Sequence, residues 1–403
     1  MRTRADLTLA TLFGGMFVMG STELLVVGVL DLMAADLRVS VQAAGALVTA
    51  YALGLAIGGP VLTALTVRLD RRLILAAALA LFALTTLLAI VTTSTALMLV
   101  ARTVTGTLQG AYIAAAFAVG GAVVPAARAG RAMAVVISGT TVSGALGVPL
   151  GTLAGQTLGW RGSFAAAAVL AVAALVATLL LVPSVPGAGG AEAQVRHAFA
   201  PPVLAVLALT VLAFASVYAA LTYIVPFLAT VTGVSGGAVS VFLLAYGVAT
   251  AAGSFGGGRF ADTNAGRALV VGTVGLAISL LTLFVFGAVA FVAGAAVLAS
   301  GLFAMGMAPS LQYRVVSLAG PGGSFAQSLP ASAANVGIAL GSLAGGVAVG
   351  AVGVSAAVAA GVALAVLAIP VAAVCSRLRP PASPAADADC KTGSGGSAPQ
   401  SWG

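Results

Sequence analysis

The sequence predicts an all-α membrane protein with twelve transmembrane helices in two similar halves. Its composition, a regular succession of long apolar runs and a repeated motif support this fold class. Of the 403 residues, 61% are hydrophobic and 6% are charged, and the mean hydropathy is +1.17. A soluble domain carries about 25% charged residues, so the chain has too few charges to cover a globular surface. The composition excludes a soluble enzyme and also a disordered chain, which combines low hydrophobicity with high net charge.

Apolar runs of the length that spans a bilayer succeed one another along the chain. A spanning helix needs about 20 apolar residues. The first run follows Arg2 and Arg4, contains Glu23 and lacks a cleavage site, so it is predicted to be an uncleaved helix. The predicted spans are 9–31, 41–66, 73–92, 96–120, 132–156, 164–182, 203–227, 238–258, 268–286, 288–312, 326–350 and 355–375.

The basic residues predict the orientation of these spans. With the N-terminus inside, 14 basic residues fall on the inner side and only Arg38 and Arg161 on the outer side. Both termini are therefore expected in the cytoplasm. Sixteen of the 17 basic residues are Arg, and Ala and Gly are abundant, which is typical of a GC-rich bacterial genome. The predicted location is the bacterial inner membrane.

A polar break near the midpoint predicts the domain organisation. Residues 183–202 are rich in Gly, Pro and Ala and predict a flexible cytoplasmic linker. The predicted domains are an N-terminal six-helix bundle over 1–182, a C-terminal bundle over 203–376 and a disordered cytoplasmic tail over 377–403.

The two halves share sequence. LGTLAG at 150–155 recurs as LGSLAG at 340–345, an offset of 190 residues, and the break at 63–72 corresponds to 258–267, an offset of 195. Each correspondence joins one span to the sixth span after it. Parallel repeats of this kind are typical of transporters that hold substrate between two halves near the bilayer midplane.

Most chemistries other than transport lack the residues they need. The only lysine, Lys391, lies in the tail, so no phosphate-binding loop for ATP exists. One histidine, His197, and two cysteines, Cys375 and Cys390, cannot build a metal cage or a disulfide framework. The net charge of +8 is spread too thinly for nucleic acid. We therefore expect no enzymatic activity, cofactor or metal, and a monomer that moves a small solute across the lipid bilayer.

Two ionisable residues fall within the predicted spans. Glu23 lies about 8 residues, and Arg102 about 6, from the outer ends of their spans, which places them within about 3 Å of the same depth. Intramembrane charges mark ion or substrate pathways. Burial favours the neutral form of a carboxyl group and a nearby cation favours the charged form, so Glu23 is predicted to carry a proton and Arg102 to tune it. The alternative is a static structural ion pair.

The fifth span carries a glycine series, and several spans carry isolated polar residues. Close packing of small residues and a kink at Pro149 predict a seal between the halves, formed by Gly144, Gly147, Pro149 and Gly151. Sparse polar groups suit a weakly polar ligand, although each one could equally form an interhelical hydrogen bond. The predicted cavity residues are Gln109, Tyr112, Thr141, Tyr218, Tyr223, Tyr246 and Asn335.

Several stretches resemble the major facilitator superfamily, and within it the twelve-helix drug:proton antiporters of the arabinose-efflux, purine-efflux and chloramphenicol-resistance group. They include GSTELLVVGVLDLMAADLRVS at 20–40, RTVTGTLQG at 102–110 and GVPLGTLAGQTLGWRGSF at 147–164. The resemblance implies proton coupling for Arg102 and Glu23 and export for the glycines of the fifth span. It implies a cytoplasmic gate at Arg68, Arg71, Arg72, Gly258, Asp262 and Arg267, in which Val67 and Thr63 replace the usual aspartate and glycine of the first copy.

The combined expectation is proton-coupled efflux of a small amphiphilic compound, with a drug of the chloramphenicol type as the leading substrate. The alternatives are an exporter of sugars, nucleosides or purines on the same fold, and an uncoupled facilitator. Glu23 separates coupled from uncoupled transport, because a passive path has little reason to hold a carboxylate in the membrane.

Overall fold

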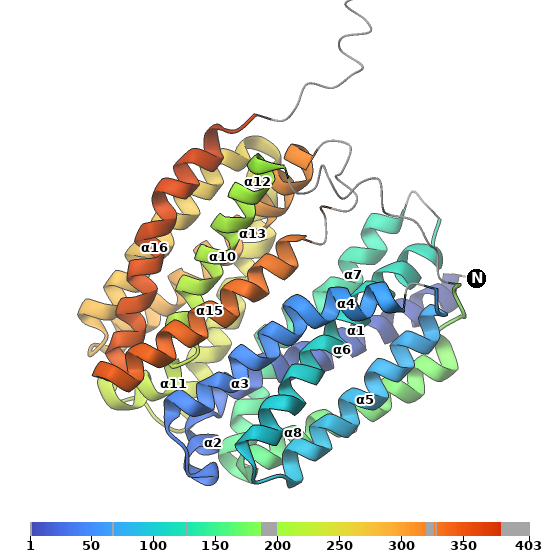
Figure 1. Ribbon diagram of the computed structural model, residues 1–403, viewed down its shortest axis with the longest axis horizontal. Coiled ribbons are helices and arrows are strands. Elements are labelled where there is room, and N and C mark those ends of the chain that lie inside the picture. Colours follow the sequence, from blue (N-terminus) through green and yellow to red (C-terminus); the bar gives the residue numbers. More distant parts are fainter. Residues whose placement is uncertain are drawn as a thin grey trace, which may run out of the picture.

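The computed structural model describes residues 2–66, 68–125, 128–186, 200–319, 326 and 329–379. Within these residues every regular element is helical, and Figure 1 shows two helical bundles side by side. Ten stretches are long and apolar enough to cross a membrane, and one of them, Ala132–Leu181, contains two spans that meet at Gly159. Helix α6 (Thr95–Ala122), the fourth span along the chain, completes the set of twelve. The predicted fold class is confirmed.

The first bundle contains six spans whose ends are set by local signals. Ser40 and Ser94 accept hydrogen bonds from main-chain N–H groups three residues later, as helix N-caps do. Gly159 has a positive φ of 74°, which breaks the helix, and the chain reverses there. The Ser163 hydroxyl donates to the Gly151 carbonyl at 2.7 Å across the break. The elements are α1 (Arg2–Gly28), α2 (Leu30–Leu37), α3 (Val41–Leu53), the π-helix η1 (Gly54–Gly58), α4 (Gly59–Leu65), α5 (Arg71–Val91), α6, α7 (Ala129–Val142), the π-helix η3 (Ser143–Gly147) and α8 (Val148–Leu181).

The second bundle contains the other six spans. Its α12 reverses at Asn264 (φ −155°, ψ 74°). The segments of α12 before and after Asn264 pack against the same part of α13, where Gly253 lies against Gly306 and Gly272 against Met307. The elements are α10 (Pro201–Leu221), α11 (Ile224–Phe227), the π-helix η5 (Leu228–Thr232), α12 (Gly237–Phe286), α13 (Ala290–Ala319), α15 (Leu329–Val352) and α16 (Val354–Arg377).

The packing of the bundles repeats as the sequence does. In the first bundle Gly151 lies against Leu25 of α1 and Gly155 against Val29, the residue between α1 and α2, which joins α8 to α1 and its C-terminal end. In the second bundle Gly341 lies against Ala215 and Gly345 against Ala219, which joins α15 to α10. All four positions are shifted by 190 residues, the offset of the LGTLAG repeat. The two bundles are therefore pseudo-symmetric copies of one six-helix unit.

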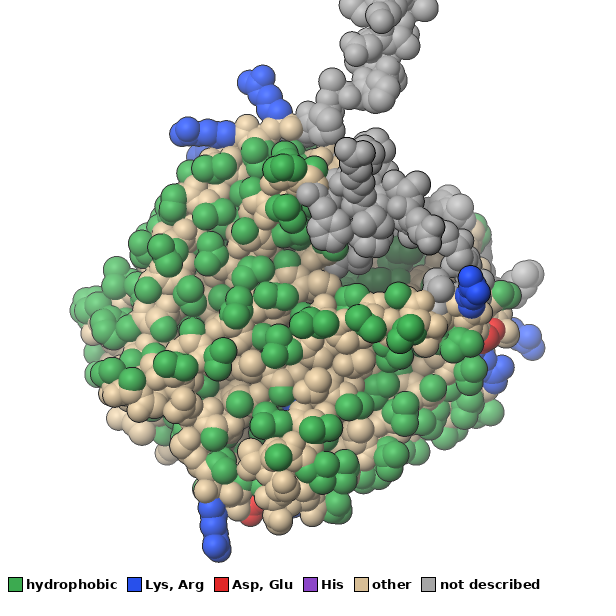
Figure 2. Space-filling model, viewed as in Figure 1, with side chains coloured by type: hydrophobic (Ala, Val, Ile, Leu, Met, Phe, Trp, Pro, Cys, Tyr) green, Lys and Arg blue, Asp and Glu red, His purple; other side chains and the backbone are tan. Residues whose placement is uncertain are grey.

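The surface has the distribution expected of a chain in lipid. Figure 2 shows green apolar side chains distributed over the whole visible face among tan atoms, with most of the blue and red charged side chains at its ends. Phe291 is 87% exposed and Leu180 is 76% exposed. Large apolar side chains that face outward on long helices are stable in hydrocarbon and not in water.

One loop assignment from the sequence is wrong. The predicted break between the spans 288–312 and 326–350 contains Arg314, but α13 continues past this residue to Ala319 and the side chain is buried. Its guanidinium donates to the Cys375 carbonyl, and to the Leu378 carbonyl at 2.6 Å. A basic side chain can satisfy the last carbonyls of a helix, so Arg314 holds the end of α16 against α13.

The glycine contacts between α15 and α10 give a prediction. A Cβ atom at Gly341 would lie 2.2 Å from the Ala215 carbonyl oxygen, which belongs to the main chain and cannot rotate away. We expect Gly341→Val to lower the free energy of unfolding by about 1–3 kcal/mol, as overpacking does. The thermal unfolding midpoint in detergent should fall accordingly. Leu340→Val, at an exposed neighbouring position, is the control. Equal midpoints for the two variants would contradict this packing.

Candidate functional site: a central cavity beside a buried carboxylate

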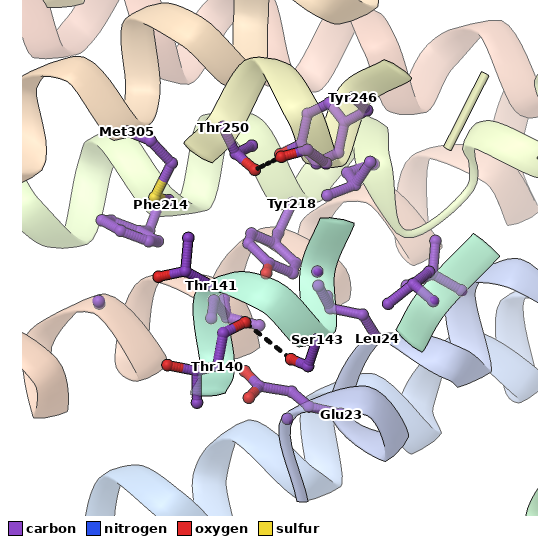
Figure 3. Close-up of a pocket in the computed structure, with 18 of the residues that line it drawn as sticks. Glu23, Leu24, Thr140, Thr141, Ser143, Phe214, Tyr218, Tyr246, Thr250 and Met305 are labelled. Atoms are coloured by element: carbon purple, nitrogen blue, oxygen red, sulfur yellow. Dashed lines mark hydrogen bonds between the residues drawn. The ribbon is translucent and has the colours of Figure 1, made fainter. Parts of the chain in front are cut away.

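A cavity of about 270 Å³ lies between the two bundles. Figure 3 shows side chains of its lining, which comes from α1, α7, η3 and the start of α8 on one side and from α10, α12, α13 and α15 on the other. Figure 1 shows the bundles in contact at the end away from the N-terminus and diverging toward it. Figure 2 shows a recess between the bundles on the diverging side. The lining includes Gly20, Glu23, Leu24, Thr140, Thr141, Ser143, Gly144, Phe214, Tyr218, Leu243, Tyr246, Thr250, Met305, Asn335 and Ile338.

The two walls of this cavity differ in chemistry. The first bundle contributes a carboxylate and hydroxyl groups, from Glu23, Thr140, Thr141 and Ser143. The second bundle contributes mainly aromatic and soft apolar surface, from Phe214, Tyr218, Tyr246 and Met305. No basic side chain is among the described lining residues. The cavity therefore combines one acidic group with an apolar, aromatic wall.

A chain of hydrogen bonds holds the Glu23 side chain. The Gln109 amide nitrogen donates to Oε2 of Glu23 at 3.0 Å, and the Tyr51 hydroxyl donates to the Gln109 amide oxygen. Gln109 and Tyr51 are buried, whereas Glu23 is half-buried and lines the cavity. Residues from α1, α3 and α6 thus fix one face of the carboxylate, and its accessible face points into the cavity.

Arg102 binds the main chain of α1, the helix that carries Glu23, and does not pair with the Glu23 carboxylate. Its guanidinium donates to the main-chain carbonyls of Thr22 and Glu23 at 3.0 and 3.2 Å, and it lies 4.1 Å from the centre of the Tyr51 ring. The side chains of Arg102 and Glu23 form no salt bridge, so the static ion pair that the sequence left as an alternative is not present. The matched depth of Glu23 and Arg102 is correct, but Gln109 supplies the direct contact to the carboxylate.

The predicted cavity residues separate into two groups. Thr141, Tyr218, Tyr246 and Asn335 line the cavity. The other three, Gln109, Tyr112 and Tyr223, do not. Gln109 lies behind Glu23, the Tyr112 hydroxyl donates to the Leu12 carbonyl inside the first bundle, and Tyr223 lies at the seam near the closed end.

Sequence reasoning missed two residues that shape the site. Tyr51 lies in the stretch YALGLAIGGP, and Phe214 in the seventh span. Tyr51 could have been found in the sequence, because a tyrosine in the middle of an apolar span needs a hydrogen-bond partner for its hydroxyl and so indicates a polar contact inside the protein. Nothing in the sequence distinguishes Phe214 from a lipid-facing aromatic residue.

Asn335 places an unsatisfied acceptor at the cavity. Its amide nitrogen donates to the Ala331 carbonyl at 2.9 Å, while its Oδ1 is buried and has no partner among the described residues. An unpaired buried acceptor is costly. A ligand or water that donates a hydrogen bond would relieve that cost, so Asn335 and Glu23 both favour a donor in the cavity.

The glycines of the fifth span mostly serve a different contact from the one predicted. Gly147 lies against Ser21 and Gly151 against Leu25, so these residues pack α1 within the first bundle and not between the halves. Gly144 is the exception, because its carbonyl lies against Gly247 of α12 in the second bundle. Pro149 follows the π-helix η3, and such segments are frequent at functional sites.

The predicted gate residues lie at the end of the protein that carries the termini. Arg68 is exposed, Arg72 donates to the Leu179 carbonyl, and the main-chain N–H of Arg71 donates to Val185 at 2.9 Å. The Arg267 N–H donates to Asn264, while Gly258 lies on the same helix. The Asp262 side chain and all of Val67 lie outside the described residues.

Asp70 is the acidic residue of the break 63–72, in which Val67 stands where the gate motif usually has an aspartate. It caps α5 by accepting from the N–H groups of Arg72 and Leu73, and it also accepts from the Ser184 hydroxyl. These hydrogen bonds, that from Ser184 first, hold the pKa of Asp70 below its usual range. Its carboxylate therefore ties the start of α5 to the segment after α8.

The fold and the cavity define a membrane transporter, and comparison with known proteins gives its family. The family model described as Major Facilitator Superfamily matches residues 11–324, and the chain belongs to this family. It is 33% identical over 352 residues to a chloramphenicol resistance protein of Streptomyces lividans, covering 82% of this chain and 86% of that one. It is 34% identical over 345 residues to the uncharacterized MFS-type transporter YtbD of Bacillus subtilis, covering 84% and 87%.

Solved structures show the same fold. A bacterial homologue of the human lysosomal transporter Spinster, in an inward-facing and unoccupied conformation, superposes with a TM-score of 0.80 at 16% identity, covering 94% of this chain and 98% of that one. The chain is thus a multi-pass membrane transporter of the bacterial type.

The hydrogen-bonded carboxylate gives a prediction. Gln109 donates to the charged form of Glu23, so Gln109→Leu should favour the neutral acid. Hydrophobic carbodiimides react with the neutral acid, and we expect several-fold faster labelling of Glu23 at neutral pH, measured by peptide mass spectrometry. Glu23→Gln gives the background. Unchanged labelling in the Gln109→Leu protein would show that this hydrogen bond does not control the carboxyl group.

Proposed function

We propose that the protein is a proton-coupled exporter of a small amphiphilic compound, with a drug of the chloramphenicol type as the leading substrate. The observation that carries the proposal is Glu23. It is the one carboxylate among the described lining residues, with one face in the cavity and the other held by Gln109. A group at the substrate site that can gain and lose a proton allows one gradient to drive the other.

The proposed orientation places both termini in the cytoplasm of a bacterial inner membrane. The basic side chains of Arg68, Arg72, Arg267 and Arg377 lie at helix ends on the side of the termini, which the positive-inside rule assigns to the cytoplasm. The cavity then opens inward. Substrate enters from the cytoplasm as Glu23 loses its proton, the bundles rock, and a proton from outside displaces the substrate.

The lining favours an uncharged or cationic aromatic substrate with hydrogen-bond donors. Phe214, Tyr218 and Tyr246 offer stacking surface, and Glu23 and the free Oδ1 of Asn335 accept hydrogen bonds. Chloramphenicol has an aromatic ring, two hydroxyl groups and an amide N–H, which fit this pattern, and the name of the Streptomyces relative supports the same class. A sugar would leave many hydroxyl groups without partners, and an anion would face Glu23.

Coupling can be tested with Glu23→Gln in proteoliposomes under an imposed proton gradient. We expect loss of gradient-driven chloramphenicol accumulation with binding retained, because the amide keeps the shape but cannot exchange a proton. Asp36→Asn, which changes an exposed acid outside the cavity, is the control. A Glu23→Gln protein that still concentrates the drug would rule out coupling through this residue, and an uncoupled facilitator would show no accumulation even in the parent.

The substrate class can be tested with a charge series on one scaffold. Chloramphenicol, its deacylated amine and its succinate ester are neutral, cationic and anionic respectively. We expect the ester to bind the purified protein at least about tenfold more weakly than the drug, a difference of about 1.4 kcal/mol. Survival of a pump-deficient bacterium expressing the protein on chloramphenicol, other antibiotics and purine analogues gives the matching cellular result. Protection against purine analogues alone would favour the metabolite exporter.

A further inference from the structure

A second cavity, of about 260 Å³, lies at the seam between α3 and α15. We call it the outer cavity, because it lies toward the end away from the termini. Its edge carries the exposed residues Ser40 and Gln42, and its floor carries the buried Tyr223 and Ser342. The other lining residues are Ala43, Ala46, Thr49, Leu343, Gly346 and Val347.

Only a thin partition separates the outer cavity from the central one. Ile338 lines the central cavity and Ser342, one helical turn further along α15, lines the outer cavity. Four residues of helix span about 6 Å. At this level the bundles are joined by the Ser342 hydroxyl, which donates to the Gly45 carbonyl at 3.1 Å, and by a longer contact from Thr49 to the Ala339 carbonyl at 3.5 Å.

Tyr223 lies in the floor of the outer cavity, beside Ser342. It lies in the break between α10 and α11, is 1% exposed, and donates from its hydroxyl to the Ser342 carbonyl at 3.1 Å. The ring crosses from the second bundle to the first. A Cβ atom at Gly45 would lie 2.0 Å, and one at Gly346 2.5 Å, from the Tyr223 hydroxyl oxygen. The side chain fits because both neighbours are glycine.

We propose that the outer cavity is a release site for the transported compound and that Tyr223 is the barrier between it and the central cavity. This inference rests on the proposed direction of export. In the observed state the barrier is closed. When the bundles rock and α3 separates from α15, the hydrogen bond from Ser342 to Gly45 breaks and the Tyr223 ring no longer packs against Gly45. The two cavities then become connected.

The lining chemistry suits release. The outer cavity offers hydroxyl and amide groups from Ser40, Gln42 and Thr49, no charged side chain among the described residues, and no aromatic ring besides Tyr223. A compound that loses the stacking surface of Phe214, Tyr218 and Tyr246 should therefore bind here more weakly than in the central cavity. The proposed ligand is the same uncharged or cationic aromatic compound with hydrogen-bond donors, held here by hydrogen bonds to hydroxyl and amide groups.

Cysteine accessibility tests the barrier. In a protein whose own cysteines are replaced by serine, Ala46→Cys reports on the outer cavity and Asn335→Cys on the central one. With a membrane-impermeant thiosulfonate added to whole cells, we expect the Ala46→Cys variant to react at least about tenfold faster than the Asn335→Cys variant, and the reverse order in inside-out vesicles. Adding Tyr223→Ala should raise external labelling of the Asn335→Cys variant at least tenfold, while adding Tyr218→Ala should not.

The outcomes separate this inference from the proposed function. A reversed order in both preparations contradicts the proposed orientation, and unchanged labelling with Tyr223→Ala, in protein that remains monodisperse, overturns the barrier. Tyr223→Phe, which keeps the ring, should leave external labelling within about threefold of the parent. Chloramphenicol should protect a third reporter, Thr250→Cys in the central cavity, at low concentration and the Ala46→Cys variant at higher concentration. Protection of the first alone overturns the release site, and protection of neither contradicts the substrate as well.

Discussion

The contact of Arg102 with α1 is the interaction on which the site depends. A charged guanidinium inside a bilayer is costly unless its hydrogen bonds are satisfied. Arg102 meets most of this requirement, because its two terminal nitrogens donate to the carbonyls of Thr22 and Glu23 and its guanidinium lies over the Tyr51 ring, while its Nε has no hydrogen-bond partner among the described residues. These contacts join α1, α3 and α6 at the depth of the cavity. Because Arg102 binds the main chain of α1 and not the Glu23 carboxylate, that carboxylate is held on one face by Gln109 and keeps its other face in the cavity.

The two bundles share a fold but differ in chemistry. The glycine contacts between α8 and α1 recur between α15 and α10 at an offset of 190 residues, yet the position equivalent to Glu23 is Ala213. The first bundle therefore holds the acid, and the second supplies the aromatic wall. In the proposed mechanism a rocking motion moves the aromatic wall relative to the acid, which couples access of the substrate to access of the proton.

Much of this architecture could be predicted from the sequence, for identifiable reasons. Long apolar runs fix the number of spans, and the rarity of charge made Glu23 and Arg102 conspicuous at similar depth. The sequence could not give the rotation of each helix, because lipid-facing and buried faces are both apolar. It therefore placed Tyr112 and Tyr223 in the cavity, assigned Gly147 and Gly151 to the wrong interface, and left Arg314 in a loop. The partners of long side chains, such as Arg314 with Leu378, depend on tertiary packing.

The central claim is that substrate and proton compete for Glu23, and proton release on substrate binding tests it most directly. Chloramphenicol added to the purified protein in weakly buffered detergent solution, with a pH indicator, should release up to one proton per protein at a pH where Glu23 is protonated. The Glu23→Gln protein should bind the drug and release none. Equal release from both proteins, or binding to the parent with no release at any pH, would contradict the account.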